Sequence, residues 1–312
     1  MIVKITSIGK RIIPPSLLPY ATRAFGHIIN LYYLQKGRKL SKEIIAYYSK
    51  CDNNVEISDV IKYLKVNGFS IFPYEWGNES NQEYISKLKS VQVFHDEKLN
   101  LPYVCFNQKR LYYPREMDAR TIQKSFCGEQ LIAQNPQSPH RYLTDHFCVE
   151  SGDIVVDCGV AEGNFGVSIV DTVSKLYLFE PDEKWMEPLH ATFAPWNDKV
   201  IIIQKYLSNI TDEANISLDD YFQDKEYPNF IKLDVEGYEE RLLHGAYNIL
   251  SSSDLKKVVV CTYHKQGDEE TLGALLRLQG YNVIASQGYM LFIYDKNFNP
   301  PYLRRGVLRA TK

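Results

Sequence analysis

The sequence predicts an α/β fold in which helices cover both faces of a mostly parallel sheet that is closed by an antiparallel hairpin. Three observations support this prediction. From Asp153 onward, short apolar runs alternate with helical segments, which is typical of parallel βαβ units. A glycine-spaced turn follows the first apolar run, and two late apolar runs, at 281–285 and 289–294, flank Gln287-Gly288. We expect this domain to span residues 117–312, preceded by an appended α+β region at residues 1–116.

Length and composition narrow the possible classes. The chain has 312 residues, 45% of them hydrophobic, and a formal net charge of −2, so it can bury a sizeable core and has no global charge that would recruit nucleic acid. Its six cysteines lack a C-x-x-C pair, which favours reduced thiols and argues against zinc. No apolar run reaches membrane-spanning length, and no signal peptide is apparent. We therefore expect a cytoplasmic protein with no nucleic-acid partner.

The N-terminal charge is asymmetric. The first acidic residue is Glu43, and eight basic residues precede it, interleaved with apolar ones. A basic amphipathic start suits peripheral contact with an anionic membrane surface, as for an enzyme that acts on a lipid-linked substrate at the inner face of the membrane. The alternative is a solvated helical face whose apolar side packs on the body of the protein.

The appended region is expected to contain helices followed by a small hairpin. Apolar residues have helical spacing from Leu17 to about Ala46, and Ser58 to Lys65 has the pattern of a capped helix that ends at Asn67-Gly68. A further short helix is expected at 84–88. Segments of β-like composition follow, with turn residues between the last two, at 91–96, 102–107 and 109–113.

The segment from Met117 to Phe147 crowds polar residues before the first strand of the sheet. It contains His140, Arg141 and Tyr142 directly after a proline. Loops that adjoin a cofactor-binding strand often cover a ligand. The alternative for Arg141 is a salt bridge that ties this segment to the sheet.

The first strand of the sheet ends in a glycine-spaced loop. From Asp153 to Gly166 the chain has the sequence DIVVDCGVAEGNFG, in which Gly159 and Gly163 permit a tight turn before a helix that begins near Asn164. Dinucleotide enzymes prefer G-x-G-x-x-G, whereas here Asp157 leads and the two glycines are four residues apart. This form resembles motif I of S-adenosylmethionine-dependent methyltransferases. The alternative is an ordinary strand-to-helix turn.

An acidic residue ends the second strand. The strand at 175–179 is followed by Glu180-Pro181-Asp182, about 20 residues after the first glycine, where a carboxylate accepts hydrogen bonds from ribose hydroxyls. Glu180 could instead cap the next helix, as Asp182 could. After a third strand at 199–204, Ser208 is expected near an adenine edge.

Three ionisable residues follow the fourth and fifth strands. Asp234 and Glu236 come at the end of the strand at 230–234, before a long helix expected from 238 to about 250, and His264 ends the strand at 257–263. The carboxyl ends of parallel strands meet at one rim, so these side chains should share a crevice. His264 suits a general base that Asp234 or Glu236 orients, unless one of the acids accepts the proton directly. The three could also hold a divalent ion, but pairing with one another or with Lys232 is the expected alternative, and we predict no metal.

Several of these motifs together resemble the FkbM-type methyltransferases over roughly Asp153 to Tyr294. The matching stretches are VVDCGVAEGNFG, LFEPDEKW, ISLDDYF, IKLDVEGYEERLLHGA and YHKQGDEETLGALLRLQGY. The fourth is the most specific, since it is similar to the family's K-x-D-V-E-G-x-E…L…G-A signature. The resemblance implies a class I, Rossmann-like fold and an S-adenosylmethionine-dependent O-methyltransferase that acts on a hydroxyl of a sugar, a glycan precursor or a similar small molecule.

The resemblance also implies roles for residues. Asp234, Glu236 and His264 fall on active-site motifs, and the SPHRY segment, which resembles a feature of a bacterial subgroup, supports His140, Arg141 and Tyr142 as substrate contacts. With their loop neighbours, the predicted cofactor contacts are Asp157, Gly159, Glu162, Gly163, Asn164, Phe165, Glu180, Pro181, Ser208 and Asp234.

Two other functions compete with this hypothesis. A nicotinamide-dependent oxidoreductase is favoured by Glu180 and opposed by the missing G-x-G-x-x-G. A non-catalytic binding module that keeps the fold as a scaffold is opposed by the acids and His264 at the strand ends.

Overall fold

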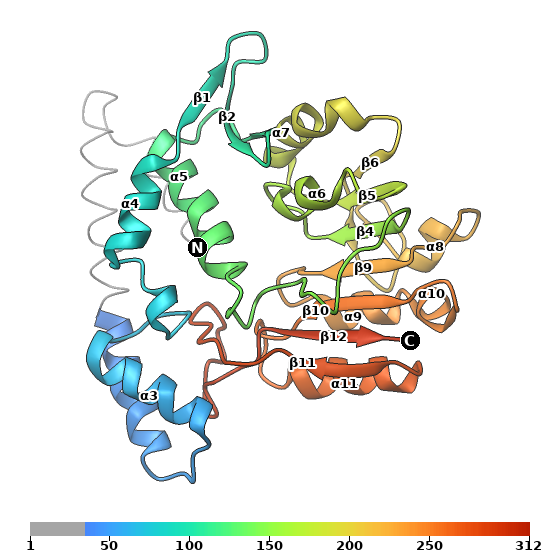
Figure 1. The fold of residues 1–312 in the computed structure, drawn as a ribbon. Helices are drawn as coiled ribbons and strands as arrows, with labels where there is room; N and C mark the ends of the chain where they lie inside the picture. The colour runs from blue at the N-terminus through green and yellow to red at the C-terminus, as the bar shows by residue number, and fades with distance from the viewer. Residues whose placement is uncertain (1–34) are drawn as a thin grey trace, which may run out of the picture. The chain divides into compact units, whose positions relative to one another are not determined.

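The computed structural model describes residues 35–312 (Figure 1). Most of the basic N-terminal segment therefore lies outside the described residues, and the membrane contact predicted for it stays a prediction. The chain forms two compact units, one ending at Ser70 and one spanning Ile71–Lys312. The boundary predicted before Met117 falls inside the larger unit and also stays a prediction. Within residues 35–312, no helix combines the length and the apolarity needed to cross a bilayer.

The described part of the smaller unit is helical. Residues 35–48 form one helix, and α3 (Val55–Asn67) forms another. The Asn54 side chain caps α3 by accepting a hydrogen bond from the Ile57 N–H, and the helix ends at Gly68, whose φ is 80°. The helix predicted at 58–65 is thus confirmed, but it starts earlier because Asn54 provides the cap.

The larger unit begins with short elements: η1 (Glu75–Gly77), α4 (Gln82–Ser90) and a sheet of order β1-β2-β3. Its antiparallel strands are β1 (Val93–Asp96), β2 (Leu101–Phe106) and β3 (Lys109–Tyr112). Asn107 and Gln108 both have positive φ, as in the two-residue hairpin turn that matches the twist of a β-hairpin. The predicted small hairpin region is confirmed.

The segment that leads into the main sheet contains helices that the sequence did not indicate. Asp118 caps α5 (Ala119–Cys127), which continues directly into a π-helical turn, η2 (Gly128–Ala133). Such turns are rare and frequently lie at functional sites.

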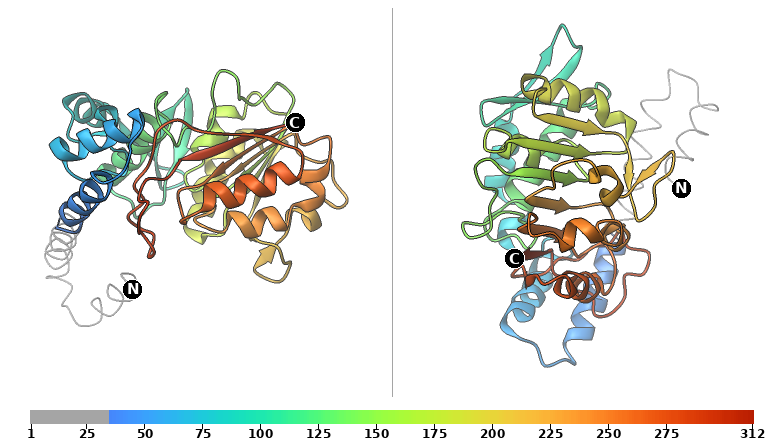
Figure 2. Two further views of the ribbon diagram at one scale, coloured as in Figure 1. Left: turned by 90° about the horizontal axis from the view of Figure 1, so that it is seen from below. Right: turned by 90° about the vertical axis from the view of Figure 1, so that its right-hand side faces the viewer.

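A seven-stranded sheet of order β11-β12-β10-β9-β4-β5-β6 forms the centre of this unit (Figures 1 and 2). In this sheet β4, β5, β6, β9 and β10 pair in parallel, and β12 pairs antiparallel with both β10 and β11. Because β4 lies between β9 and β5, the strand order reverses there, which in open α/β sheets marks the ligand-binding crevice. The predicted fold class is confirmed. The strands are β4 (Ile154–Cys158), β5 (Lys175–Phe179), β6 (Val200–Ile203), β9 (Phe230–Leu233), β10 (Lys257–Cys261), β11 (Asn282–Ala285) and β12 (Val307–Thr311).

The closing hairpin uses a different second strand from the predicted one. Residues 289–294 are outside the sheet and make only an isolated bridge, between Met290 and Arg304. The strand inserted between β10 and β11 is β12. Both segments are apolar, but 289–294 buries Met290 and Leu291 as irregular backbone, whereas β12 buries Val307 and Leu308 within the sheet. The prediction for 289–294 was therefore wrong.

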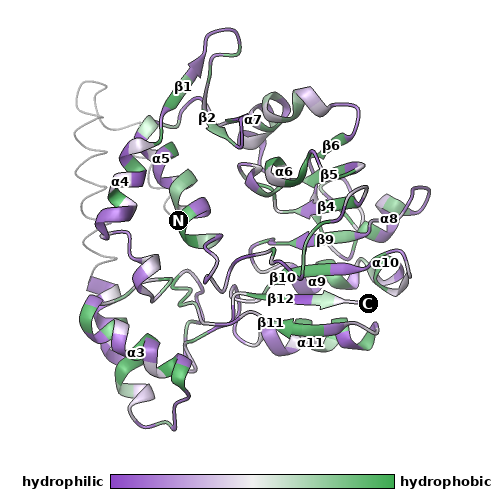
Figure 3. Cartoon of the chain, in the orientation of Figure 1, coloured by the Kyte–Doolittle hydropathy of each residue, from purple (hydrophilic) through white to green (hydrophobic). Residues whose placement is uncertain are grey.

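Helices cover both faces of the sheet. On one face, α6 (Asn164–Ile169) and α7 (Glu183–Phe193) pack on alternate strand residues such as Val155, with η3 (Ala194–Trp196) following α7. On the other, the remaining helices pack on the intervening residues, such as Val156; these helices are α8 (Leu218–Phe222), α9 (Glu239–His244), α10 (Tyr247–Ser251) and α11 (Asp268–Leu278). Apolar residues run along the strands between these two layers (Figure 3).

Two secondary-structure elements near this second face differ from the sequence prediction. The helix expected over 238–250 is broken into α9 and α10 at Gly245, where a Cβ would lie 2.1 Å from the Ser208 carbonyl oxygen. A small parallel pair, β7 (Tyr206–Leu207) and β8 (Asn215–Ile216), follows β6.

Candidate active site

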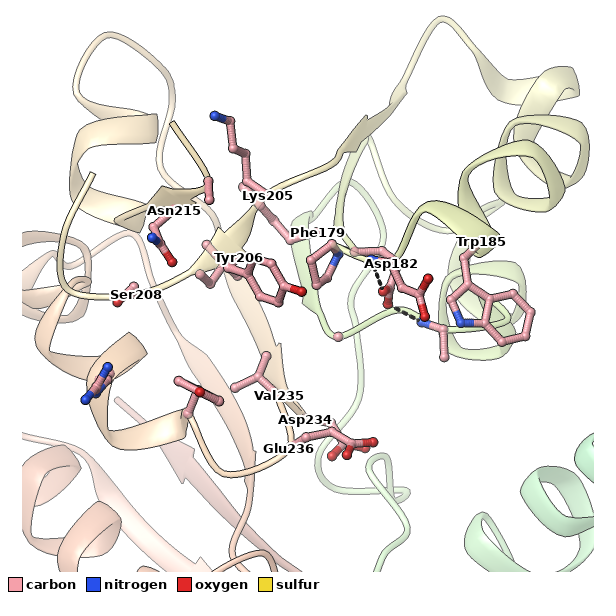
Figure 4. A pocket seen from close by; sticks show the side chains of 18 of the residues that line it. Phe179, Asp182, Trp185, Lys205, Tyr206, Ser208, Asn215, Asp234, Val235 and Glu236 are labelled. Atoms are coloured by element: carbon pink, nitrogen blue, oxygen red, sulfur yellow. Dashed lines mark hydrogen bonds between the residues drawn. The ribbon is translucent and has the colours of Figure 1, made fainter. Parts of the chain in front are cut away.

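A cavity of about 770 Å³ opens at the carboxyl ends of β4, β5 and β9 (Figure 4). Its volume lies within the range of ligand sites. Figure 4 shows Tyr206 and Ser208 on one wall, Asp182 and Trp185 on another, and Asp234 near the end of β9. The full lining is Gly159, Ala161, Phe179, Glu180, Pro181, Asp182, Lys184, Trp185, Lys205, Tyr206, Leu207, Ser208, Ile210, Ala214, Asn215, Asp234, Val235, Glu236, Tyr238, Arg241 and Tyr263.

The glycine-spaced loop packs directly on the end of β9. Gly159 has a φ of 81°, and a Cβ there would lie 1.8 Å from the Asp234 carbonyl oxygen. No other residue fits this crossing without moving the backbone. The loop after β4 and the loop after β9 therefore touch at this point and form one edge of the cavity.

A buried ion pair supports this loop from below. Lys232 Nζ donates to Asp157 Oδ1 and to the Gly159 carbonyl oxygen, each at 2.7 Å. The Asp157 side chain is fully buried and does not line the cavity. Burial raises the pKa of Asp157, and the neighbouring Lys232 cation opposes this shift only in part. Asp157 thus lies in position to hold the loop rather than to contact a ligand in the cavity.

Glu180 lines the cavity at the end of β5. Its Oε2 accepts a hydrogen bond from the Ala161 N–H at 2.8 Å, and its Oε1 accepts one from the Asp182 N–H at 2.9 Å. A carboxylate has about four acceptor sites, so Glu180 can still accept from two vicinal hydroxyls of a ligand. The backbone bonds set the direction of the carboxylate in advance.

Asp234 is the centre of a cluster of aromatic and imidazole side chains. Tyr142 Oη donates to its Oδ2 at 2.6 Å, and Tyr263 Oη donates to its Oδ1 at 3.3 Å. His140 Nε2 lies 3.6 Å from Oδ2, and His264 Nε2 lies 3.5 Å from Oδ1. The Asp234 side chain is still 18% exposed and lines the cavity, whereas both imidazoles lie behind it.

The protonation of this cluster follows from its contacts. Burial alone would raise the pKa of Asp234, but the nearby His140 imidazole and the charges of His264 and Lys232 hold that pKa well below its usual range. Burial would lower the pKa of His264, but its contact with Glu239 and the charge of Asp234 raise that pKa above its ordinary value. Asp234 is therefore an anion that cationic neighbours support.

The loop after Asp234 is strained and enclosed on one side. Glu236 is exposed, lines the cavity and has a φ of 54°, and Gly237 has a φ of 93°. A non-glycine residue in this region indicates a conformation that its surroundings impose. Glu239, rather than Glu236, reaches His264, with Oε1 2.8 Å from Nδ1. The predicted metal-ligand alternative of Asp234, Glu236 and His264 therefore does not bring its atoms together. The groups whose potential ligand atoms do converge are Asp234, Glu239 and His264, and His140, Asp234 and Cys261.

The lead-in segment (residues 117–147) contributes two of its three predicted residues to this cluster. His140 Nε2 contacts Tyr263 Oη at 3.2 Å, while its Nδ1 lies 3.4 Å from Gln134 Nε2. Tyr142 contacts Asp234. Arg141 instead lines a separate cavity of about 140 Å³, together with Glu129, Gln130, Gln134, Tyr142, Asn164 and Phe165.

The predicted residues therefore fall into groups. The cavity lining includes Gly159, Glu180, Pro181, Ser208, Asp234 and Glu236. Asn164 and Phe165 line the smaller cavity, Glu162 accepts a hydrogen bond from Ser125, and Gly163 packs on Leu189 and Phe193. His264 and His140 lie behind Asp234, and Asp157 lies below the loop. For all of them, contact with cofactor or substrate stays a prediction.

Two residues beside Asp234 and His264 were not among the predicted site residues. Tyr263 lines the cavity beside Asp234, but one tyrosine among 23 has no distinguishing pattern. Glu239 had a signal, because it is the second glutamate of the D-V-E-G-x-E signature. The sequence could not show that it points inward.

Comparison with known proteins adds an independent observation on the second half of this site. Residues 205–290, which include β9, the Asp234 loop and His264, match the model of a family described as the methyltransferase FkbM domain. This part of the chain is thus similar to the FkbM methyltransferase domain. Domains of this class use S-adenosylmethionine as methyl donor, and the resemblance seen in the sequence motifs is confirmed. No curated protein sequence matched the chain.

Solved structures include several similar methyltransferases. The FkbM methyltransferase of Methylobacillus flagellatus KT aligns with 63% of this chain and 56% of its own length, at 17% identity and a TM-score of 0.43. The magnesium protoporphyrin IX methyltransferase of Synechocystis PCC 6803, solved with bound S-adenosylmethionine, aligns with 52% of this chain and 71% of its own, at 16% identity and a TM-score of 0.34. The aligned part of this chain thus spans just over half the length of the Methylobacillus protein.

Proposed function

We propose that this protein transfers a methyl group from S-adenosylmethionine to a hydroxyl of a sugar, a glycan precursor or a similar small molecule. The observation that carries the proposal is that one cavity contains both Glu180, pre-oriented at the end of β5, and Asp234, the anionic centre of the cluster at the end of β9. The first suits a ribose and the second suits a hydroxyl that must lose its proton. The cytoplasmic location expected from the cysteine pattern belongs to the same proposal.

The side chains that line the cavity fit S-adenosylmethionine. Glu180 can accept from the two ribose hydroxyls, while Pro181 and Val235 offer apolar surface for an adenine ring. Asp234 and Glu236 place negative charge where a sulfonium would be favoured. When bound, S-adenosylmethionine would supply a methyl group to the acceptor oxygen in an in-line displacement, in which the sulfur leaves with the C–S bonding electron pair.

Asp234 is the residue assigned to accept the hydroxyl proton. It reaches the cavity, whereas His264 is only 6% exposed and does not line it. The low pKa of Asp234 makes it a weak base towards a resting alcohol. As the new O–C bond forms, however, the alcohol oxygen becomes strongly acidic, so a weak base suffices late in the reaction. The two imidazoles and two tyrosines around Asp234 hold it in place for this transfer.

Isothermal titration calorimetry tests the cofactor. We expect S-adenosylmethionine and S-adenosylhomocysteine to bind, with Kd values in roughly the micromolar range, and NADH not to bind. Selective NADH binding would instead support a nicotinamide-dependent oxidoreductase. Folded protein that binds neither would remove the proposal.

Methyl transfer from labelled S-adenosylmethionine to a panel of sugars, nucleotide sugars and lipid-linked sugars tests the reaction. With an active acceptor, Asp234→Asn should lower kcat by about 10²–10⁴-fold, the size of a lost general base. The matched control is Asp224→Asn, a surface acid outside the cavity, which should leave kcat unchanged. Equal activity of the two variants would contradict the role of Asp234.

A further inference from the structure

Glu239 is a buried carboxylate that the proposed chemistry has not used. It begins α9, directly after the Asp234 loop, and is only 1% exposed. A fully buried acid is costly unless cations or N–H groups surround it. Its surroundings therefore indicate what it holds in place.

One oxygen of Glu239 contacts two elements of the site. Oε1 accepts hydrogen bonds from the Val235 N–H at 3.0 Å and the Gly237 N–H at 3.3 Å, one on each side of Glu236. The same oxygen lies 2.8 Å from His264 Nδ1. Glu239 thus joins the strained loop at the end of β9 to the imidazole at the end of β10.

The contact acts on the charge of the His264 ring. Glu239 Oε1 lies 2.8 Å from Nδ1, outside hydrogen-bond angles, and the opposite nitrogen, Nε2, lies 3.5 Å from Asp234 Oδ1. A negative charge this close to an imidazole favours its protonated form. Asp234 is therefore held by a histidine whose charge depends on Glu239.

We propose that Glu239 is the positioning residue of this active site: it holds the Val235–Gly237 loop against the cavity and places its negative charge beside the His264 ring, whose other nitrogen lies towards Asp234. This role rests on the proposed function, because it assigns Asp234 to the acceptor hydroxyl. The charged and titratable groups around His264 are Asp234 and Glu236 from the β9 end, Glu239 from α9, Asp268 from α11, the adjacent Tyr263, and Arg304, which donates to the His264 carbonyl oxygen at 3.0 Å.

Glu239→Gln separates charge from shape. Its amide oxygen can still accept from the loop N–H groups, but the negative charge beside His264 is gone. Glu239→Ala removes both. The matched control is Glu240→Gln, the next residue of the same helix, which is exposed. Histidine side-chain NMR follows the His264 protonation and tautomer, calorimetry gives the Kd for S-adenosylmethionine, and kcat is measured against pH.

We expect Glu239→Gln to lower the His264 pKa by about one pH unit or more, since an opposite charge in contact is lost. Its kcat should fall roughly 10²-fold, as for a reacting group displaced by about 1 Å, and its pH profile should shift to lower pH. Its Kd for S-adenosylmethionine should stay within a few-fold of the wild-type value, whereas Glu239→Ala should also weaken binding as the loop is released. Glu240→Gln should match the wild type.

A His264 pKa that is unchanged in Glu239→Gln would overturn the proposal, even if stability and activity fell, because a merely structural role would produce that result. The His264 titration needs no acceptor and no bound cofactor. If the wild-type protein failed to bind S-adenosylmethionine, the proposed function would fall, while a shifted His264 pKa would still support the contact with Glu239.

Discussion

Replacing Lys232 by Met should destabilise the larger unit strongly. Lys232 is only 4% exposed, and its Nζ makes 2.7 Å contacts to Asp157 Oδ1 and to the Gly159 carbonyl oxygen. Asp157 Oδ2 already has no hydrogen-bond partner within the described structure, so the substitution leaves a buried carboxylate with no compensation. Breaking a buried ion pair from one side costs about 3–5 kcal/mol in free energy of unfolding.

Thermal and chemical unfolding measure this cost. For a unit of this size, 3–5 kcal/mol corresponds to a fall in Tm of roughly 6–20 °C. The control is Lys175→Met, at the exposed start of β5, which should change stability by no more than about 0.5 kcal/mol. The double variant Lys232→Met/Asp157→Asn should recover much of the loss, because it also removes the unpaired charge.

The cost should also depend on pH. Without the Lys232 cation, burial raises the pKa of Asp157 further above its unfolded value. The folded state of the variant then binds more protons than the unfolded state between those two pKa values, so its stability rises as the pH falls. The deficit relative to wild type should shrink from pH 8 to pH 5. A loss no larger than that of Lys175→Met, or one that does not change with pH, would refute this account of the ion pair.

Two further predictions concern the cavity. Glu180→Gln should weaken S-adenosylmethionine binding by roughly 10–100-fold in calorimetry, because hydrogen bonds to a charged group contribute about 1.5–3 kcal/mol, whereas the exposed Glu226→Gln should bind normally. Gly159→Ala should lower both the free energy of unfolding and the affinity for S-adenosylmethionine, because its Cβ would lie 1.8 Å from the Asp234 carbonyl oxygen. The control is Gly152→Ala, where φ is also positive but a Cβ would have nothing within 4 Å. It should lose only the roughly 1–2 kcal/mol of stability that a left-handed backbone costs a non-glycine residue. Equal effects of the two alanine variants would count against the crossing of the two loops.

The sequence predicted the parallel strands well because each is a short buried apolar run bounded by turn residues. The strand at 175–179 matches β5 residue for residue. The segment at 289–294 has the same composition and was wrongly predicted as a strand, since apolar runs do not distinguish a buried irregular segment from a sheet strand. The π-helical turn at 128–133 was missed because Glu129 and Gln130 gave it the appearance of a polar loop.

The candidate site could be predicted as a set of strand ends but not as a set of contacts. The order of strands places Asp157, Glu180 and Asp234 at one rim, which the alternation of strands and helices implies. Which of these acids reaches the cavity depends on tertiary neighbours that lie far away in the sequence. Lys232 encloses Asp157, and the lead-in segment delivers Tyr142 to Asp234 across 92 positions of the chain. Local sequence patterns do not predict contacts between residues so far apart in the chain.

The distribution of buried and cavity-lining carboxylates favours S-adenosylmethionine over a dinucleotide. Asp157 and Glu239 are buried; the Lys232 cation pairs with Asp157, and His264 lies beside Glu239, so neither carboxylate faces a ligand in the cavity. Glu180 and Asp234 face the cavity, where their carboxylates can act on what binds there. The negative charges of these two acids favour a cationic sulfonium beside them, in a cavity that Lys184, Lys205 and Arg241 also line. The tight crossing at Gly159 adds to this preference, because the loop that a dinucleotide would use for its pyrophosphate is here pressed against the carbonyl of Asp234.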